Sequence, residues 1–261
     1  MNQRLSALLL SCFLGGGLAL AQEPASDPGL APSEDTPMPA KEPVKDATED
    51  APDDKAPKAV VGKKAPVFSL KDTKGKIHNL SDYSGKYVVI EWFNPGCPYC
   101  RGIYKEGIVQ DTRKKMRSID PDAVYLAINS TANQPEDFIV TQSDSFLADH
   151  EQKDIPVLMD YDGTVGRLYE AKTTPHMYLV NPDGVLIYAG AITDDRNFTN
   201  GTESTNYVIA AARQDTSGEQ VAPTEVRPWG CGVKYADGGS RRGGGRRGGG
   251  RRGGGKPSES P

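Results

Sequence analysis

Hydrophobic residues are scarce in this sequence of 261 residues. They make up 36% of the chain, and the mean hydropathy of -0.55 is low for a chain of this length. Folding needs enough buried apolar surface to offset the lost conformational entropy, so such a chain is not expected to fold along its whole length. We therefore expect one folded domain with polar extensions.

The sequence has one long apolar run, at the N-terminus, in MNQRLSALLLSCFLGGGLALAQEPA. The run is shorter than the roughly 20 residues that span a bilayer, which argues against a membrane anchor. It follows Arg4 and closes with Ala19-Leu20-Ala21, the pattern of a secretory signal, and it continues past Cys12, which argues against lipidation there. We expect residues 1–21 to be a signal peptide. The mature chain would then be exported, periplasmic or extracellular, without a transmembrane anchor.

Both ends of the mature chain offer little apolar surface. Residues 22–58 are rich in Pro, Ala and acidic residues, which predicts a disordered linker. Residues 237–261 contain three Arg-Arg-Gly-Gly-Gly units, which predict a disordered tail. The net charge of -4 is the sum of an acidic N-terminal part and a basic C-terminal part of the chain. The arginines from Arg241 to Arg252 predict either a solvated tail or a contact with a polyanion, and export argues against nucleic acid as that partner.

Residues 59–236 alternate strand-like and helix-like segments. Apolar alternation on both sides of Lys74-Gly75 predicts a hairpin, and Asn-Pro-Asp-Gly between two apolar runs predicts a second one. The other expected strands are 87–93, 123–129 and 156–160, and the expected helical segments are 97–118, 135–150, 163–169 and 204–214. This order predicts an α/β domain in which a central mixed β-sheet has helices on both faces.

Two cysteines, Cys97 and Cys100, stand where a buried strand gives way to a helix. A thiol at a helix N-terminus feels the partial positive charge of the first turn, which favours the thiolate. Cys97 is therefore the predicted nucleophile, and Pro98 suits the first helical position. Cys100 would then attack a mixed disulfide on Cys97 and release the reduced substrate. After removal of the signal peptide Cys231 is the third thiol, so the three cannot all pair within one chain.

Three other interpretations of the cysteine pair were weighed. A zinc site would need two further ligands from Cys231, His78, His150 and His176, whose spacing is not typical of ligands. A c-type haem site would need His after Cys100, and residue 101 is Arg. A purely structural disulfide would constrain the unfolded chain little, because its loop is so short. We expect no metal and no organic cofactor.

The motifs EWFNPGCPYC, TTPHMYLV, VGKKAPVFSL, NPDGVLIYAGAI and RPWGCGVKY occur in an order that resembles the thioredoxin superfamily, within it the secreted redoxin or peroxiredoxin-like group. The resemblance covers about residues 60–235 and implies a thioredoxin-like fold. It also implies that Thr174-Pro175 is cis, faces the thiols and offers the Thr174 backbone to an extended substrate peptide. Glu91 occupies the place of a buried acid that takes the proton of Cys100, and its pKa should be raised. His176 either tunes the reactivity of the thiols or occupies a position at the rim of their site.

The sequence also departs from parts of this group. Peroxiredoxins have a Pro-x-x-x-Thr/Ser-x-x-Cys frame, whereas Asn94 stands three residues before Cys97. Relatives often keep the thiol equivalent to Cys231 but lack the second cysteine of the pair, so Cys231 is a further candidate redox thiol. We expect a thiol-disulfide oxidoreductase acting on protein or small thiol substrates with an unidentified redox partner. The alternatives are a thiol peroxidase and a non-enzymatic binding module with a polyanion-binding tail.

Overall fold

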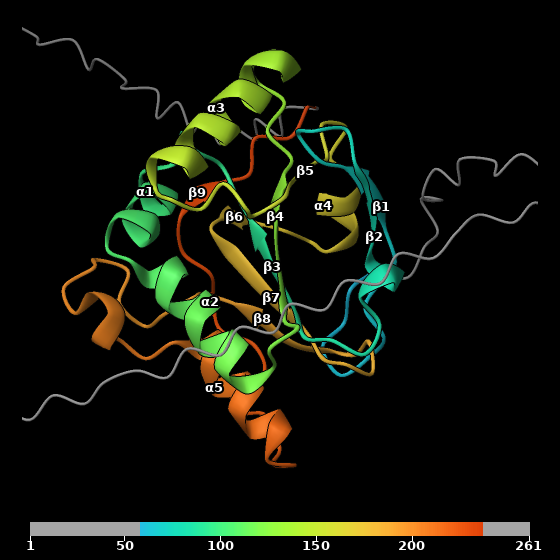
Figure 1. Cartoon of the computed structure of the whole chain (residues 1–261), viewed down its shortest axis with the longest axis vertical. Coiled ribbons are helices and arrows are strands. Elements are labelled where there is room, and N and C mark those ends of the chain that lie inside the picture. Colours follow the sequence, from blue (N-terminus) through green and yellow to red (C-terminus); the bar gives the residue numbers. More distant parts are fainter. Residues whose placement is uncertain (1–57, 237–261) are drawn as a thin grey trace, which may run out of the picture. The chain divides into compact units, whose positions relative to one another are not determined.

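The computed structural model describes residues 58–236 (Figure 1). The predicted signal peptide, the predicted linker up to residue 57 and the predicted tail lie outside the described residues. Among the helices of residues 58–236, none combines the length and the apolar character needed to cross a membrane.

A five-stranded mixed sheet forms the centre of the domain, in the order β5-β4-β3-β7-β8. Strands β3, β4 and β5 are parallel, whereas β7 runs antiparallel to β3 and forms a hairpin with β8. The strands are β3 (Val88–Trp92), β4 (Val124–Asn129), β5 (Val157–Met159), β7 (His176–Val180) and β8 (Leu186–Gly190). The predicted α/β fold with a central mixed sheet is confirmed.

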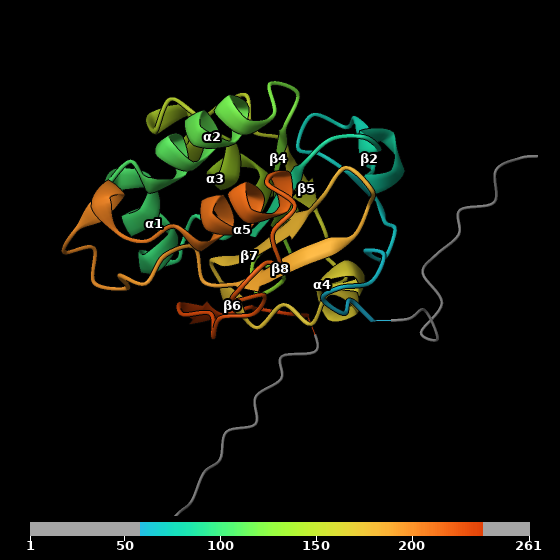
Figure 2. The same cartoon turned by 90° about the horizontal axis from the view of Figure 1, so that it is seen from below.

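Helices cover both faces of this sheet, as predicted, but unequally (Figure 2). One face is packed by α1 (Pro98–Lys105), α2 (Ile108–Ile119), α3 (Glu136–Asp149) and α5 (Tyr207–Thr216). The other face is packed by α4 (Thr164–Leu168), the 3-10 helix Leu80–Tyr83 and the hairpin of β1 (Ser69–Lys71) and β2 (Ile77–Asn79). A second 3-10 helix, Gly201–Glu203, precedes α5.

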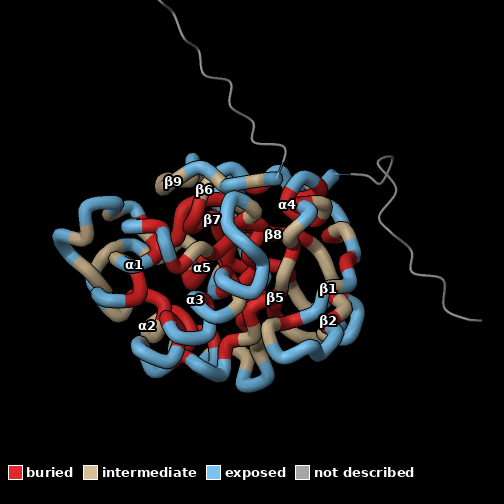
Figure 3. The backbone as a smooth tube through the Cα atoms, turned by 90° about the horizontal axis from the view of Figure 1, so that it is seen from above, coloured by how far each residue is buried: buried red, intermediate tan, exposed pale blue. Residues whose placement is uncertain are grey.

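Strand β3 is buried along its whole length and carries one acid into the core. Figure 3 shows the strands as the buried centre of the domain, with exposed segments around them. Successive side chains of a strand point to opposite faces, so Val89 and Glu91 face α1 and α2, whereas Ile90 and Trp92 face α4. This alternation places the carboxyl group of Glu91 beneath the helix that carries both cysteines.

The prediction of a single helix over residues 97–118 is wrong. The structure has two helices, α1 and α2, separated at Gly107, which adopts a left-handed conformation with φ 71°. A left-handed residue ends a helix because it turns the chain out of the helical path, and glycine adopts it without a Cβ penalty. The break lets α1 and α2 both pack on the sheet in different directions.

A second small sheet, not predicted from the sequence, lies beside the cysteines. Strand β6 (Thr173–Thr174) pairs antiparallel with β9 (Cys231–Gly232), and Thr174 is the register partner of Cys231. Figures 1 and 3 show β9 lying next to β6. The pairing brings a residue from the end of the domain to the start of α1.

Candidate active site

Cys97 is the residue that precedes the first turn of α1, and Pro98 occupies the first helical position, as predicted. The side chain is buried, with 2% of its surface exposed. Its Sγ donates a hydrogen bond to the Thr174 carbonyl oxygen at 2.9 Å. The three cysteines of the described residues are free thiols, so the structure represents the reduced protein.

The surroundings of Cys97 stabilise its thiolate. A hydrogen bond from the Cys100 thiol is the largest cause, and it lowers the pKa of Cys97 to about 4 against the opposing effect of burial. The Cys100 backbone N–H and the Cys231 thiol contribute in the same direction. The Thr174 hydroxyl is buried without a hydrogen-bond partner while Cys97 is a thiol, and it lies close enough to lower this pKa as well. Cys97 therefore carries the negative charge at neutral pH, as the helix position predicts.

The two other thiols remain protonated at neutral pH. Cys100 is fully buried, and desolvation, followed by its hydrogen bond to Cys97, holds its pKa well above the usual value. Cys231 is half-buried, and desolvation together with its hydrogen bond to Cys97 raises its pKa to about 11. Cys97 is thus the thiol with the lowered pKa, and its neighbours Cys100 and Cys231 keep their protons.

Glu91 lies on the same side of the sheet as α1 and is fully buried. Burial raises the pKa of Glu91 to about 7, as its place in an apolar strand predicts. Two phenols oppose this rise by donating to the same carboxylate oxygen, Oε2: Tyr125 at 2.8 Å and Tyr104 at 2.9 Å. The other oxygen, Oε1, is buried and has no hydrogen-bond partner among the described residues. Glu91 is therefore held by one oxygen and offers the other as a proton acceptor.

Neither tyrosine was predicted from the sequence, although each follows a regular spacing. Tyr104 follows Cys100 by four residues, which places the two side chains on one face of α1. In the parallel pair β3–β4, Glu91 is the register partner of Ala127, and Tyr125 precedes Ala127 by two residues on the same face. The spacing on α1 is visible in the sequence, whereas the strand register is not.

The Thr174-Pro175 peptide bond is cis, as predicted, and Thr174 contacts Cys97. His176, in contrast, is buried and does not fill a rim position. It belongs to the opposite face of the sheet from Glu91, and its Nδ1 lies 2.9 Å from the Tyr178 hydroxyl. Desolvation lowers the pKa of His176 to about 3, so the ring is neutral at physiological pH. The structure brings Cys97, Cys100, Cys231, Glu91, Thr174 and Pro175 together, whereas the ring of His176, the residue after Pro175, lies on the opposite face of the sheet.

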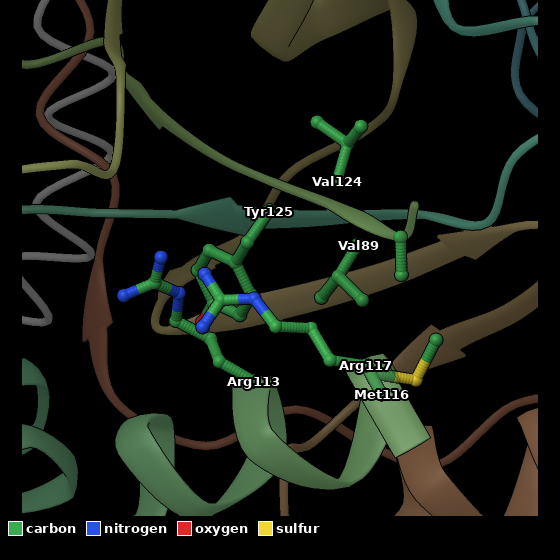
Figure 4. A pocket seen from close by; sticks show the side chains of 7 residues that line it. Val89, Arg113, Met116, Arg117, Val124 and Tyr125 are labelled. Atoms are coloured by element: carbon green, nitrogen blue, oxygen red, sulfur yellow. The ribbon is translucent and has the colours of Figure 1, made fainter. Parts of the chain in front are cut away.

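A small pocket lies between α2 and strands β3 and β4, away from the thiols. Figure 4 shows the side chains of Arg113 and Arg117 beside the ring of Tyr125, with Val89 and Met116 in the apolar part of the wall. The positive charge of the Arg113 guanidinium opposes the rise in the pKa of Tyr125 that burial causes. Within residues 58–236, no group of three His, Cys, Asp or Glu side chains is arranged to hold a metal ion.

The chain resembles known redox proteins over its central part. Residues 61–189 match the model of the AhpC/TSA family. Thiol-disulfide oxidoreductase ResA of Bacillus subtilis is 27% identical over 135 residues, which are 51% of this chain and 69% of that protein. Thioredoxin-like protein YneN of the same organism is 28% identical over 134 residues, which are 51% of this chain and 73% of that protein.

Two solved structures resemble a larger part of the chain. An uncharacterized conserved protein from Geobacillus kaustophilus superposes with a TM-score of 0.58 at 24% identity, over 67% of this chain and 92% of that one. A hypothetical protein from Sinorhizobium meliloti superposes with a TM-score of 0.57 at 23% identity, over 70% of this chain and 98% of that one. The segment that matches the AhpC/TSA family carries Glu91 and both cysteines of Cys-Pro-Tyr-Cys, and the chain shares its fold with these two solved structures.

Proposed function

We propose that the protein is a thiol-disulfide oxidoreductase whose nucleophile is Cys97. The observation that carries the proposal is the position of Cys97 directly before α1 and against the Thr174 carbonyl oxygen, with Cys100 in the first turn and surroundings that lower the pKa of Cys97. A low-pKa thiolate next to a second thiol can both attack a disulfide and be released from the resulting mixed disulfide. The name of the similar protein ResA, thiol-disulfide oxidoreductase, supports this chemistry.

The reaction runs in two exchange steps. The Cys97 thiolate attacks one sulfur of a client disulfide, forms a mixed disulfide and releases the first client thiolate. Cys100 then gives its proton to Glu91 and attacks Sγ of Cys97, which forms the Cys97–Cys100 disulfide and releases the second client thiolate. The client gains two electrons and the two cysteines lose them. The reverse sequence would oxidise a client dithiol, and a redox partner must restore the starting state in either direction.

Glu91 is the proposed proton acceptor in the second step. Its unpartnered Oε1 and its pKa of about 7 suit a group that accepts and returns a proton near neutral pH. Thr174 and Pro175 form the proposed substrate shelf because they lie against Cys97. His176 directly follows this shelf, and its ring lies on the other face of the sheet against the Tyr178 hydroxyl.

Cys231 is proposed as an alternative resolving thiol. It is the register partner of Thr174, which contacts Cys97, and it is less buried than Cys100. If it replaces Cys100, a Cys97–Cys231 disulfide forms by the same exchange step. Peptide mapping of the oxidised protein by mass spectrometry would distinguish the two disulfides.

Insulin reduction tests the proposal directly. The wild-type protein with a dithiol donor should precipitate the insulin B chain, and Cys97→Ser should abolish the reaction. Cys231→Ser is the matched control, because it also removes a thiol near Cys97 but leaves the Cys97–Cys100 pair. Equal rates for the wild type and Cys97→Ser would reject the assignment.

A thiol peroxidase is the second candidate, favoured by the match to the AhpC/TSA model. The chain lacks the peroxiredoxin frame, since Asn94 precedes Cys97 by three residues. Rapid consumption of hydrogen peroxide that depends on Cys97 and exceeds the rate of insulin reduction would favour this candidate.

Export and a polyanion contact through Arg241 to Arg252 remain part of the proposal. Fractionation of cells that express the full chain would test the export.

A further inference from the structure

The segment from Trp229 to Gly232, here called the strap, lies over the predicted nucleophile. Its Cys231 is the register partner of Thr174, whose carbonyl oxygen accepts the hydrogen bond of Cys97. Cys97 is only 2% exposed, although the proposed reaction requires its sulfur to meet the sulfur of a client. The reduced protein therefore holds its nucleophile under a piece of its own chain.

The strap occupies the backbone edge that a client polypeptide would use. Strand β6 consists of Thr173 and Thr174, and its partner is β9 of the strap. An extended peptide adds to a sheet by pairing with the main-chain groups of a free edge, and here those groups are already paired. A client cannot pair with β6 while β9 is in place.

The strap lies close to the shelf because residue 230 is glycine. Gly230 has φ 140°, and a Cβ atom at this position would overlap the Thr174 carbonyl oxygen and lie 3.2 Å from Cδ of Pro175. Gly232, two residues on, has room for a Cβ, whose closest neighbour would be the Lys172 carbonyl oxygen at 4.0 Å. The two glycines thus differ sharply in what an added methyl group would do.

Besides its pairing with β6, the strap is held through Trp229. The indole of Trp229 donates to the Thr193 carbonyl oxygen at 2.9 Å, and its ring lies 5.9 Å from the rings of both Tyr99 and Phe198. Tyr99 is a residue of the Cys-Pro-Tyr-Cys motif itself, so the strap rests on the first turn of α1. Trp229, Gly230 and Cys231 are only partly buried, which is typical of segments that open locally.

The chain on either side of the strap is fixed to the domain. Before it, the Val226 N–H donates to the Ala189 carbonyl oxygen at 3.2 Å. After it, the Val233 N–H donates to the Lys172 carbonyl oxygen at 3.2 Å, and the Ala132 N–H donates to the Lys234 carbonyl oxygen at 2.8 Å. These hydrogen bonds confine any movement to the strap, so the strap would close again in the same position after opening.

We propose that the strap determines which substrates reach Cys97: it fills the peptide position of the shelf and admits a client only when a flexible, extended segment displaces it. The inference rests on the proposed function of Cys97. It makes the strap a specificity-determining segment, because a rigid protein disulfide cannot replace a strand on β6, whereas an unfolded polypeptide can. No chemical step is added, since the strap changes access to the sulfur.

The test compares the alkylation of Cys97 by a small and a bulky reagent. Reduced full-length protein is treated with iodoacetamide or with a polyethylene glycol maleimide, and the loss of the unmodified Cys97 peptide is followed by mass spectrometry. In the wild type the bulky reagent should react much more slowly than the small one. Gly230→Ala should speed the bulky reagent by about tenfold by favouring the open strap, and Trp229→Ala should act in the same direction. Gly232→Ala is the matched control and should leave the rate unchanged.

The fully buried Cys100 reports on global unfolding, because a variant that unfolds would expose Cys100 together with Cys97. Equal bulky-reagent rates at Cys97 in the wild type and in both strap variants, with Cys100 still protected, would overturn the role of the strap. Insulin reduction by the same samples separates the two proposals. Retained insulin reduction with no change in labelling rejects only the strap, whereas the expected labelling without any insulin reduction rejects only the oxidoreductase.

Discussion

Replacing Tyr125 with Phe tests how Glu91 is tuned. The change removes the hydroxyl that donates to Oε2 at 2.8 Å and leaves Tyr104 as the hydroxyl donor to that oxygen. A hydrogen bond to a charged group is worth about 1.5–3 kcal/mol, and one pKa unit corresponds to about 1.4 kcal/mol. The pKa of Glu91, about 7 in the wild type, should therefore rise by at least about one unit.

This rise has a measurable kinetic consequence. At pH 7 the carboxylate fraction of Glu91 should fall from about a half to about a tenth. The step in which Cys100 resolves the mixed disulfide should then slow about fivefold at pH 7 and recover near pH 9. The other ionisable groups that act on Glu91 or on its phenol partners are Cys97, Cys100 and Arg113, and the variant retains all of them.

Stopped-flow measurement of mixed-disulfide decay between pH 5 and 10 gives the kinetic profile, and carbon-13 NMR of the glutamate carboxyl gives the pKa itself. Tyr188→Phe is the matched control, because it removes a buried hydroxyl that donates to the Ala191 carbonyl oxygen at 2.6 Å. A Tyr125→Phe profile that coincides with the Tyr188→Phe profile would refute the assigned role of Glu91 and its phenol partners.

Three further predictions concern single side chains. Cys97 should be alkylated by iodoacetamide faster than Cys100 at every pH from 5 to 9, and equal rates would contradict its low pKa. The Cys100→Ser variant should accumulate mixed disulfides between Cys97 and clients, visible on gels without reductant. If Cys231 resolves them, fewer should accumulate and a Cys97–Cys231 disulfide should form. The absence of both the mixed disulfides and the Cys97–Cys231 disulfide would contradict the mechanism. Between pH 4.5 and 8 the free energy of unfolding of the wild type should fall by about 3 kcal/mol relative to Glu91→Gln, because burial favours the neutral acid and stability is lost as pH rises through its pKa of about 7. Parallel denaturation curves at both pH values would contradict this.

The main sheet was predictable because its strands have strong local patterns. The β-branched and aromatic run that ends in Trp92 gave the central strand, and the Asn181 to Gly184 turn gave the hairpin of β7 and β8. The break at Gly107 was missed because buried residues follow near-helical spacing on both sides of it, with Ile103 before it and Ile108, Thr112 and Met116 after it. Periodicity thus located the helical region but did not detect the turn within it.

The strap was not predictable, because its pairing is short and distant in sequence. Strands β6 and β9 have two residues each, too few for any alternation to be seen. The cysteine pair and the buried acid were found from local context, whereas Tyr125 depends on the register of two parallel strands. Local chemistry was therefore accessible from the sequence, and the neighbours that tune it required the structure.

The shared position of Cys97 between two thiols limits how many electrons the domain can store. A disulfide takes two of the three sulfurs, so they form one disulfide at a time, and because Cys97 is the proposed nucleophile that disulfide is Cys97–Cys100 or Cys97–Cys231. A redox titration would therefore record a single two-electron couple even though two isomeric disulfides contribute to it. Fully oxidised protein should retain one alkylatable thiol among these three, and the identity of that thiol, Cys100 or Cys231, would report the ratio of the isomers.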